Sequence, residues 1–333
     1  MWRAGNLTFA GLAKVVSLAA IAALASTQAA HPQEWPQRPV KIVVPYAPGG
    51  NADSVARLVA QHLGEAFGQP FVVENRPGAT GAIAAEAVAR SPADGYTLLL
   101  ASLPQIAIMP AVVKTSFDPR KDAVPISAMT TSPLVLVVHP SLPVKSIADL
   151  VAFARNRPGE LTYAAAGFGS MTHLAMALFL QRAGIEMIPV MYKGGSSTMA
   201  DVVAGHVKSY FLNISGAVPY ATGGMVRLLA VSSARRVPQI PDVPTMVESG
   251  YPGFKVLNWT GLTAPAGTPK QTIDRIAKEV SRIMKDPKIV AALSAEGIDA
   301  LGSSPEEFAA MIAADIPLWA EAIRIAGVGT HDK

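Results

Sequence analysis

The chain has 333 residues, a formal net charge of +4 and no cysteine. The lack of cysteine excludes disulfide bonds, thiolate metal sites, a cysteine nucleophile and an acylated N-terminal cysteine. Because the charge is close to neutral, it gives no support to nucleic acid or an anionic membrane as a partner. High alanine content with few aromatic residues favours a helix-rich α/β chain over an all-β one.

The first residues have the pattern of a secretory signal peptide. Arg3 and Lys14 give a positively charged start, residues 15–25 form a short apolar run, and Thr27-Gln28-Ala29 resembles a small-residue cleavage signal. The apolar run is too short to span a bilayer comfortably, and no later stretch approaches the roughly 20 apolar residues that a transmembrane helix needs. We therefore expect cleavage near Ala29 and an exported, unanchored mature protein.

The stretch 40–57 predicts a strand, a glycine turn and a helix. Residues 40–44 form a β-branched run, residues 45–50 break it with prolines and glycines, and apolar residues then recur at helical spacing. Glycines let the backbone approach a ligand closely, and the first N–H groups of a helix are unpaired donors with partial positive charge. The turn can therefore hold an anion, although many such turns bind nothing.

The same order of elements continues along the chain. We predict strands at 70–74 and 96–101, with a glycine turn at 75–81 before a helix at 82–90, and a loop at 102–105. Parallel strands that alternate with helices predict an open sheet, whose ligand crevice lies beyond the carboxyl ends of its strands. All three loops are expected at that edge.

A second sheet is predicted after Pro133. Its strands are expected at 134–138, 161–165, 187–192, 207–213 and 226–232, with helices at 146–157, 171–182 and 198–204. A strand at 255–264 then runs back toward the first sheet, and the remaining chain is mainly helical. Two crossings, near residues 133 and 257, would form a hinge.

The predicted chain consists of a signal peptide followed by two lobes, each built on one of the two sheets. Residues 1–29 are the predicted signal peptide, residues 30–133 with 257–333 form lobe 1, and residues 134–256 form lobe 2. The predicted fold class is α/β, with two α/β lobes joined by a two-strand hinge and a ligand cleft between them.

Six short motifs occur in the order and approximate spacing of a known family. They are Pro45-Tyr-Ala-Pro-Gly-Gly-x-x-Asp53, Glu74-Asn-Arg-Pro-Gly-Ala-x-Gly81, Ala101-Ser102, Gly167-x-Gly-Ser-x-x-His-Leu174, Tyr192-Lys-Gly-Gly195 and Pro241-Asp-Val-Pro-Thr245. Together they resemble the Bug family of extracytoplasmic solute receptors, the binding components of tripartite tricarboxylate transporters. The resemblance spans nearly the whole mature chain. It implies a type II periplasmic binding fold, of the Venus flytrap kind, that closes on a small carboxylate without catalysis.

The resemblance also implies that loops of both lobes hold the ligand through backbone N–H groups, side-chain hydroxyls and ordered water. The ligand-binding candidates are Tyr46, Pro48, Gly49, Gly50, Gly78, Ala79, Thr80, Ser102, Gln105, Gly167, Gly169, Ser170, His173, Lys193, Gly194 and Asn213, with Asp53 and Trp259 in supporting roles. Neutral donors at helix starts can satisfy an anion without burying a full cation, and water bridges would let related acids share one frame. No catalytic residue, metal ligand or cofactor is expected.

Several candidates also have a purely structural interpretation. Ser170 is most simply the N-cap of the following helix, and His173 can equally be a satisfied, partly buried histidine. The negative charge of Asp53 interacts favourably with the helix dipole, and its side chain fixes the Gly-Gly turn. It is given a supporting role because a carboxylate in direct contact with an anionic ligand would repel it. Lys193 is either solvated or attracts a second carboxylate, and Trp259 is either a cleft wall or packing.

The chain departs from the family at three positions. Gln105 follows the third strand, where a Thr or His is common, and Lys208 and Leu212 stand where acidic residues are expected. The ligand therefore stays open among di- and tricarboxylates, aromatic acids and acidic amino acids.

The predicted function is a monomeric periplasmic receptor that captures a small carboxylate and delivers it to a membrane transporter of the tripartite tricarboxylate type, or to a sensor protein. The alternative is a secreted α/β enzyme, either a nucleotide-dependent oxidoreductase or a hydrolase. Against it, Gly167-Phe-Gly-Ser-Met-Thr172 has Thr in place of the third glycine of a dinucleotide motif, and Gly194-Gly-Ser-Ser-Thr198 lacks the final glycine of a serine-hydrolase elbow. The six histidines are scattered and form no His-Glu-x-x-His metal motif.

Overall fold

The computed structural model describes residues 34–192 and 195–329. The chain divides into two units, Met1–Gln37 and Arg38–Lys333, and the fold described below is that of the second. The predicted signal peptide, residues 1–29, lies outside the described residues. Within the described ranges, no helix is both long enough and apolar enough to cross a bilayer.

Strands and helices alternate along most of the described chain. The strands are β1 (Val40–Val44), β2 (Phe71–Asn75), β3 (Thr97–Ser102), β4 (Ala123–Val138), β5 (Thr162–Ala165), β6 (Ile188–Met191), β7 (Ser209–Asn213), β8 (Arg227–Val231), β9 (Leu257–Pro265) and β10 (Asp299–Ala300). The helices are α2 (Asn51–Phe67), η1 (Ala79–Gly81), α3 (Ala82–Ala89), η2 (Pro104–Ile108), α4 (Met109–Val112), α5 (Pro119–Asp122), α6 (Ile147–Arg155), α7 (Met171–Ala183), α8 (Gly195–Val203), α9 (Ile214–Thr222), α10 (Lys270–Met284), α11 (Pro287–Ala295) and α12 (Pro305–Ile325).

The parallel strands predicted at the start of the fold are confirmed. β1 lies between β2 and β3 and pairs in parallel with both, and β3 then pairs antiparallel with β9. The helix predicted after β1 is also present, because Val55, Val59 and Leu63 recur on its buried face. It ends at Gly68, whose φ of 67° lets its N–H bond to the Gly64 carbonyl. The loops after β1 and β3 therefore leave the sheet at the same edge.

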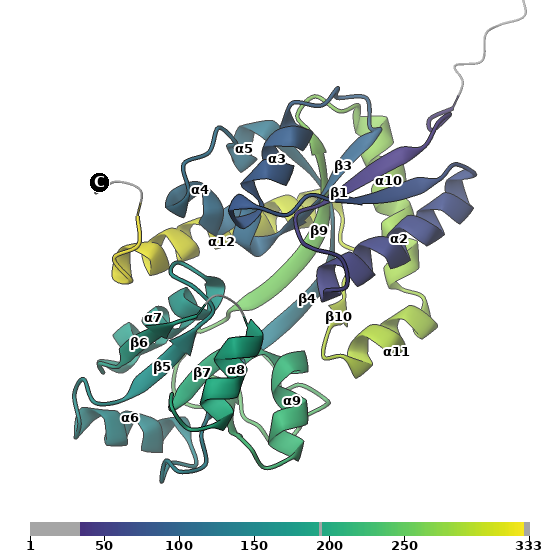
Figure 1. Ribbon diagram of the computed structural model, residues 1–333. Helices are drawn as coiled ribbons and strands as arrows, with labels where there is room; N and C mark the ends of the chain where they lie inside the picture. Colours follow the sequence, from purple (N-terminus) through teal and green to yellow (C-terminus); the bar gives the residue numbers. More distant parts are fainter. Residues whose placement is uncertain (1–33, 193–194, 330–333) are drawn as a thin grey trace, which may run out of the picture. The chain divides into compact units, whose positions relative to one another are not determined.

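Strand β4 belongs to two sheets. It pairs with β9 from Ala123 to Pro133, and from Leu134 to Val138 it pairs with β7 and β8. The first sheet has the order β2-β1-β3-β9-β4, with β10 also on β4, and the second continues as β4-β7-β5-β6, with β8 on β4 (Figure 1). We call them sheet A and sheet B. One strand thus carries the chain from sheet A to sheet B.

The sequence indicated only the second part of β4, at 134–138. Two prolines, Pro125 and Pro133, interrupt the first part, and proline normally argues against a central strand because it has no N–H for the ladder. The structure accommodates Pro125 at an irregularity, where the register with β9 shifts between Pro125 and Ser127. A second correction concerns residues 102–105, predicted as a loop, because Pro104–Ile108 forms a π-helical turn with Pro104 at its start.

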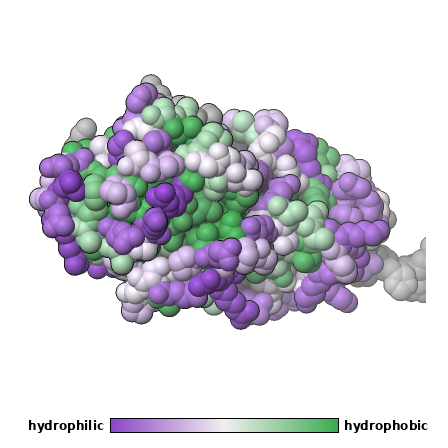
Figure 2. Space-filling view, turned by 90° about the horizontal axis from the view of Figure 1, so that it is seen from below, coloured by the Kyte–Doolittle hydropathy of each residue, from purple (hydrophilic) through white to green (hydrophobic). Residues whose placement is uncertain are grey.

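Helices cover both sheets. Figure 1 shows α2 and α10 on one side of sheet A and α3 and α5 on the other. The stripe predicted in α10 is confirmed, since Ile273, Ile276 and Val280 are buried. On sheet B, α7 packs against β5 and β7, and α9 packs against β4, β7 and β8. Figure 2 shows one face of the molecule, on which hydrophobic residues gather in the centre with hydrophilic residues around them.

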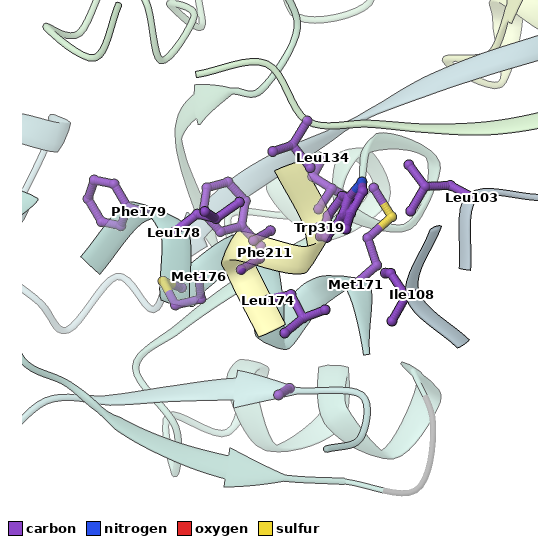
Figure 3. Close-up of a cluster of buried hydrophobic side chains, with 14 of the residues drawn as sticks. Leu103, Ile108, Leu134, Met171, Leu174, Met176, Leu178, Phe179, Phe211 and Trp319 are labelled. Atoms are coloured by element: carbon purple, nitrogen blue, oxygen red, sulfur yellow. The ribbon is translucent and has the colours of Figure 1, made fainter. Parts of the chain in front are cut away.

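Helix α12 contacts elements of both sheets. It packs against β4 and η2 and also against α7, which covers sheet B. Figure 3 shows Trp319 of α12 beside Leu103, Leu134 and Met171, all members of one buried cluster. The hydrophobic core therefore continues from one sheet to the other through this helix.

Gly261 of β9 lies where the packing leaves no room for a side chain. A Cβ at this position would lie 2.5 Å from Phe308 Cζ and 2.7 Å from the Ser127 carbonyl oxygen. We expect Gly261→Ala to lower the free energy of unfolding by about 1–3 kcal/mol, because an aromatic ring and a backbone atom must shift. Urea unfolding of the purified protein measures this effect.

Gly50→Ala is the matched control. Its Cβ would meet nothing within 4 Å, and its backbone is extended, with φ −87°. We expect a change within about 0.5 kcal/mol. Equal unfolding midpoints for the two variants would contradict the predicted crowding at Gly261.

Candidate functional site

A cavity of about 330 Å³ lies where the loop after β1 and the end of β3 approach the paired strands β4 and β9. Its lining residues are Tyr46, Gly50, Asn51, Ala52, Val55, Ser102, Thr130, Ser132, Asn213, Asn258, Trp259, Thr260 and Ile298. None of these lining residues carries a formal charge. The volume suits a small molecule, because ligand pockets start near 300 Å³.

The side chain of Tyr46 joins two sequence-predicted residues. Its Oη lies 2.7 Å from Ser102 Oγ and accepts a hydrogen bond of 2.9 Å from Gln105 Nε2. Gln105 also bonds to Ser102 through its Oε1 and donates to the Thr80 carbonyl at 3.4 Å. Burial raises the pKa of Tyr46, so it remains a neutral phenol. The network fixes a polar wall of neutral hydroxyl and amide groups.

The start of α2 forms a second wall. Gly50 is the N-cap and supplies no side-chain acceptor, so the first N–H groups of the helix have no capping side chain. The preceding Gly49 has a φ of 92°, which favours glycine, and this conformation turns the chain from β1 into the helix. A Cβ at Gly50 would point into open space. Gly50, Asn51 and Ala52 line the cavity, so the uncapped start of the helix borders it.

Asp53 holds this turn from behind. Its Oδ2 accepts hydrogen bonds of 3.0 Å from the Gly49 N–H and 3.0 Å from Arg57 Nε, and its Oδ1 accepts one of 2.8 Å from Asn75 Nδ2. Only 3% of the residue is exposed, and it does not line the cavity. The hydrogen bond from Arg57, with those from Gly49 and Asn75, lowers the pKa of Asp53 to about 2 despite its burial. Both oxygens of the carboxylate are thus occupied by hydrogen bonds that hold the turn.

The Gly167–Ser170 turn lies over sheet B and does not line this cavity. Ser170 caps α7 by accepting the His173 N–H at 3.3 Å, as its structural interpretation predicts. The His173 Nδ1 accepts the Gly169 N–H at 3.2 Å, and the ring stacks on Tyr163. Burial lowers the pKa of His173, so the imidazole is neutral near neutral pH. In this arrangement His173 supports the turn through its ring nitrogen.

A second cavity, of about 430 Å³, opens over sheet B. Its lining residues are Ala166, Thr172, Met199, Tyr210, Leu212, Asn213, Ser215, Gly216 and Tyr220. Asn213 borders both cavities, and its side chain does not cap α9. The departure at Leu212 gives this second cavity an apolar wall. Lys208 lines neither cavity, because its Nζ bonds to the Gly205 carbonyl at 2.7 Å.

The structure brings together only part of the predicted site. Tyr46, Gly50, Ser102, Asn213 and Trp259 line the first cavity. Gln105 and Thr80 join them by hydrogen bonds, whereas Pro48, Gly49, Gly78 and Ala79 are exposed and do not line it. Gly167, Gly169, Ser170 and His173 lie apart from it, near the second cavity, and Lys193 and Gly194 lie outside the described residues.

Ala79 and Thr80 have backbone strain that the sequence did not indicate. Their φ angles are 46° and 55°, in the left-handed region that non-glycine residues rarely adopt. Thr80 is tied down there by the bond from Gln105 to its carbonyl. The hydrogen bond therefore holds a strained turn at the rim of the polar wall.

Eight lining residues lie outside the residues that the sequence motifs specify. They are Asn51, Ala52, Val55, Thr130, Ser132, Asn258, Thr260 and Ile298. Four of them lie on β4 and β9, where Thr130 and Thr260 bond to each other at 2.7 Å. A signal was present, because small polar residues gather in two strands that are otherwise apolar. Among the described residues, no group of three or more His, Asp or Glu side chains could hold a metal ion.

Asp53 should make the stability of the fold depend on acid pH. A pKa lowered from 3.8 to about 2 gives stability that is present above pH 4 and is lost as the pH falls toward 2. We expect Asp53→Asn to cost about 1–2 kcal/mol at pH 7. We also expect the variant to lose less stability than the wild type between pH 4 and pH 2.5. Urea unfolding at both pH values tests this, and identical pH dependence in the two proteins would contradict it.

Comparisons with known proteins agree with the fold. The family model TctC, "Tripartite tricarboxylate transporter family receptor", matches residues 55–328. Protein BugT of Bordetella pertussis is 36% identical over 298 residues, which cover 88% of this chain and 90% of that protein.

Two solved structures are similar over almost their whole length. One, Rpa4515 of R. palustris with adipate, has 36% identity and a TM-score of 0.77, over 89% of this chain and 99% of that chain. The other, MatC (Rpa3494) from Rhodopseudomonas palustris with bound malate, has 31% identity and a TM-score of 0.73, over 87% of this chain and 100% of that chain. The likeness confirms the predicted periplasmic-binding-protein fold with two α/β lobes. The chain belongs to the tripartite tricarboxylate transporter family of receptors.

Proposed function

We propose that this protein is a periplasmic receptor that binds a small carboxylate in the cavity beside Tyr46, Gly50 and Ser102. The observation that carries the proposal is the uncapped start of α2, which borders an uncharged cavity. Backbone N–H groups at a helix start attract an anion, and they do so without the desolvation of a buried lysine or arginine. Two similar structures are described with adipate and with malate, both carboxylates, which supports the same ligand class here.

Asp53 does not oppose an anion in this cavity. Its carboxylate lies next to the Arg57 guanidinium, so their charges largely offset each other. The carboxylate oxygens are also occupied by the Gly49 and Asn75 donors. Asp53 therefore acts on the ligand indirectly, because it fixes the geometry of the turn that borders the cavity.

The ligand is proposed to lack an amine. An ammonium group needs acceptors, preferably a carboxylate, but no acidic residue lines either cavity in the described parts of the chain. Apolar side chains such as Val55, Ile298 and Leu212 border the remaining space. Carboxylates with a short apolar frame therefore fit better than acidic amino acids.

The lobe boundaries and the partners are part of the same proposal. β4 leaves sheet A after Pro133 and β9 pairs with it from Leu257, which supports lobes formed by 30–133 with 257–333 and by 134–256. A ligand that contacts both lobes would favour their closed arrangement. We propose that the protein is exported after cleavage near Ala29 and acts as a monomer. It would deliver its ligand to a membrane transporter of the tripartite tricarboxylate type, or to a sensor protein.

The contacts of Ser102 favour a receptor over a hydrolase. A serine nucleophile needs an adjacent base, usually histidine. Ser102 bonds instead to Tyr46 and Gln105, neither of which is a base at neutral pH. The serine is therefore suited to hydrogen bonding of a ligand.

Thermal unfolding with a panel of acids tests the proposed function. The panel contains adipate, malate, succinate, citrate, benzoate and ATP. An acid present at 100 times its dissociation constant should stabilise the protein by about 2.7 kcal/mol. Gly50→Val should abolish this shift, because the new side chain points into the open space at the helix start. A shift with ATP and with none of the acids would contradict the proposal.

Ser54→Val is the control for Gly50→Val. It places the same side chain in the first turn of α2, but Ser54 is exposed and does not line the cavity. This variant should keep the full thermal shift. Equal loss of binding in both variants would mean that helix damage, rather than blockage of the cavity, explains the result.

Glutarate and glutamate form a matched pair for the amine. They differ only by the amino group, so their affinities isolate its effect. We expect glutarate to bind at least tenfold more tightly than glutamate, a difference of about 1.4 kcal/mol, because the ammonium has no acidic partner in either cavity. Calorimetric titration measures both affinities, and tighter binding of glutamate would show that the ligand class is wrong.

A further inference from the structure

Two adjacent strands form the floor of the first cavity. β4 and β9 pair there in antiparallel fashion, and each contributes two polar residues to the lining, which are Thr130, Ser132, Asn258 and Thr260. In the register of the ladder, Thr130 is opposite Thr260 and Ser132 is opposite Asn258. Residues that are opposite each other in a ladder share one face of the sheet. The four side chains therefore form one polar group, which we call the floor patch.

The contacts of Trp259 indicate which face of β9 this is. Trp259 lies between Asn258 and Thr260, and successive side chains of a strand point to opposite faces. Its indole Nε1 donates a hydrogen bond of 2.6 Å to Asp315 of α12, and only 1% of the residue is exposed. The side chains of Asn258 and Thr260 thus face the cavity, whereas the indole packs on the other side of the strand.

Three residues of the floor patch have hydrogen-bond partners within the protein. Thr130 Oγ1 and Thr260 Oγ1 lie 2.7 Å apart and bond to each other. Ser132 Oγ donates a hydrogen bond of 3.2 Å to the Gly297 carbonyl. These contacts hold the three side chains in place without a ligand.

Asn258 has no such partner. Its Oδ1 is enclosed and accepts no hydrogen bond from the described parts of the chain. Its Nδ2 donates to no described residue either, and unlike Oδ1 it is not enclosed. An enclosed polar atom without a partner lowers the stability of a fold, so a purely structural role does not account for an asparagine here. The accessible end of the amide is a donor with two N–H groups.

We propose that Asn258 is a specificity-determining residue, whose Nδ2 donates a hydrogen bond to the second carboxylate of a dicarboxylate ligand. This inference rests on the proposed function of the cavity, in which the start of α2 binds one carboxylate. Asn258 lies on β9, so a ligand that bonds both to the α2 turn and to the amide must carry acceptor oxygens at both ends. Both sets of donors are neutral, which avoids the desolvation of a buried lysine or arginine.

The amide should also act against monocarboxylates. A monocarboxylate whose single acid group lies at the start of α2 would place an apolar end against Asn258. The amide donor would then lose its access to water without gaining a partner, and such an unpaired group costs affinity. The residue would therefore both attract the second carboxylate and disfavour its absence.

Calorimetric titration with two matched pairs of acids tests the inference. Succinate is paired with butyrate and adipate with hexanoate, because the members of each pair have equal carbon chains and differ only in the second carboxylate. The wild type should bind the better of the two dicarboxylates about tenfold or more tightly than its paired monocarboxylate. Asn258→Leu has a side chain of similar size without a donor. It should weaken that dicarboxylate about tenfold or more, and the monocarboxylate by no more than about threefold.

Two further variants separate the lost hydrogen bond from damage to the fold. Asn258→Asp keeps nearly the same shape but replaces the donor by a negative charge, so it should weaken the dicarboxylate about tenfold more than the monocarboxylate. This variant also provides the test if Asn258→Leu fails to fold. Asn156→Leu is the matched control, because Asn156 is exposed at the end of α6 and lines neither cavity. It should bind every acid as the wild type does.

The outcomes distinguish the inference from the function on which it rests. Equal weakening of both members of a pair in Asn258→Leu, or a dicarboxylate affinity that does not change, would overturn the role of Asn258. So would an equal effect of Asn156→Leu. If the wild type binds both members of each pair equally well, or binds only other acids of the panel, the inference fails and the receptor function stands. If the wild type binds no acid at all, the proposed function fails and the inference fails with it.

Discussion

β4 and β9 run antiparallel from Ala123 to Pro133, and this pairing joins the parallel strands of sheet A to sheet B. Beyond Pro133, β4 continues into sheet B, whereas β9 begins at Leu257 beside the same point. The residues at this junction carry small polar side chains toward the cavity. The same pair of strands thus determines both how the sheets are connected and what lies at the floor of the site.

The polar residues that line the cavity are all uncharged. Tyr46, Ser102 and Gln105 form hydrogen bonds with one another. The negative charge of Asp53 is paired with Arg57, and its oxygens bond to the turn. Such a site offers an anion directional donors but little long-range attraction. Recognition then depends on shape and on hydrogen-bond geometry, so the positions of the α2 turn and of the Tyr46 hydroxyl matter more than the net charge of the protein.

Much of the fold could be predicted because local patterns and long-range structure agree. The β-branched run at 40–44 and the glycine turn after it predicted β1 and α2, and the apolar stripe of α10 predicted its buried face. The first part of β4 was missed because Pro125 and Pro133 oppose a central strand locally, and only pairing with β9 overrides them. A proline pattern does not reveal which neighbouring strand will accommodate it.

The site was less predictable than the fold, for a related reason. Motifs identified Tyr46, Gly50 and Ser102, which lie at turns, whereas Thr130 and Asn258 are 128 residues apart and meet only through strand pairing. The contact between Asp315 and Trp259 could not be predicted either, because an acid on an amphipathic helix usually faces solvent. Only the fold brings the indole Nε1 to 2.6 Å from the Asp315 carboxylate.

The close approach of Gly261 to Phe308 also limits how this protein can evolve. Every amino-acid substitution of a glycine adds at least a Cβ, and at position 261 that atom would lie 2.5 Å from the Phe308 ring. A smaller residue at position 308 would remove this contact, but the Ser127 carbonyl oxygen, 2.7 Å from the same Cβ, would still have to shift. Loss of that ring, in turn, removes the edge-on support of Trp259. A larger residue at position 261 therefore requires two adjustments at once, of the ring at 308 and of the backbone at 127, and the first of them also alters the packing of Trp259.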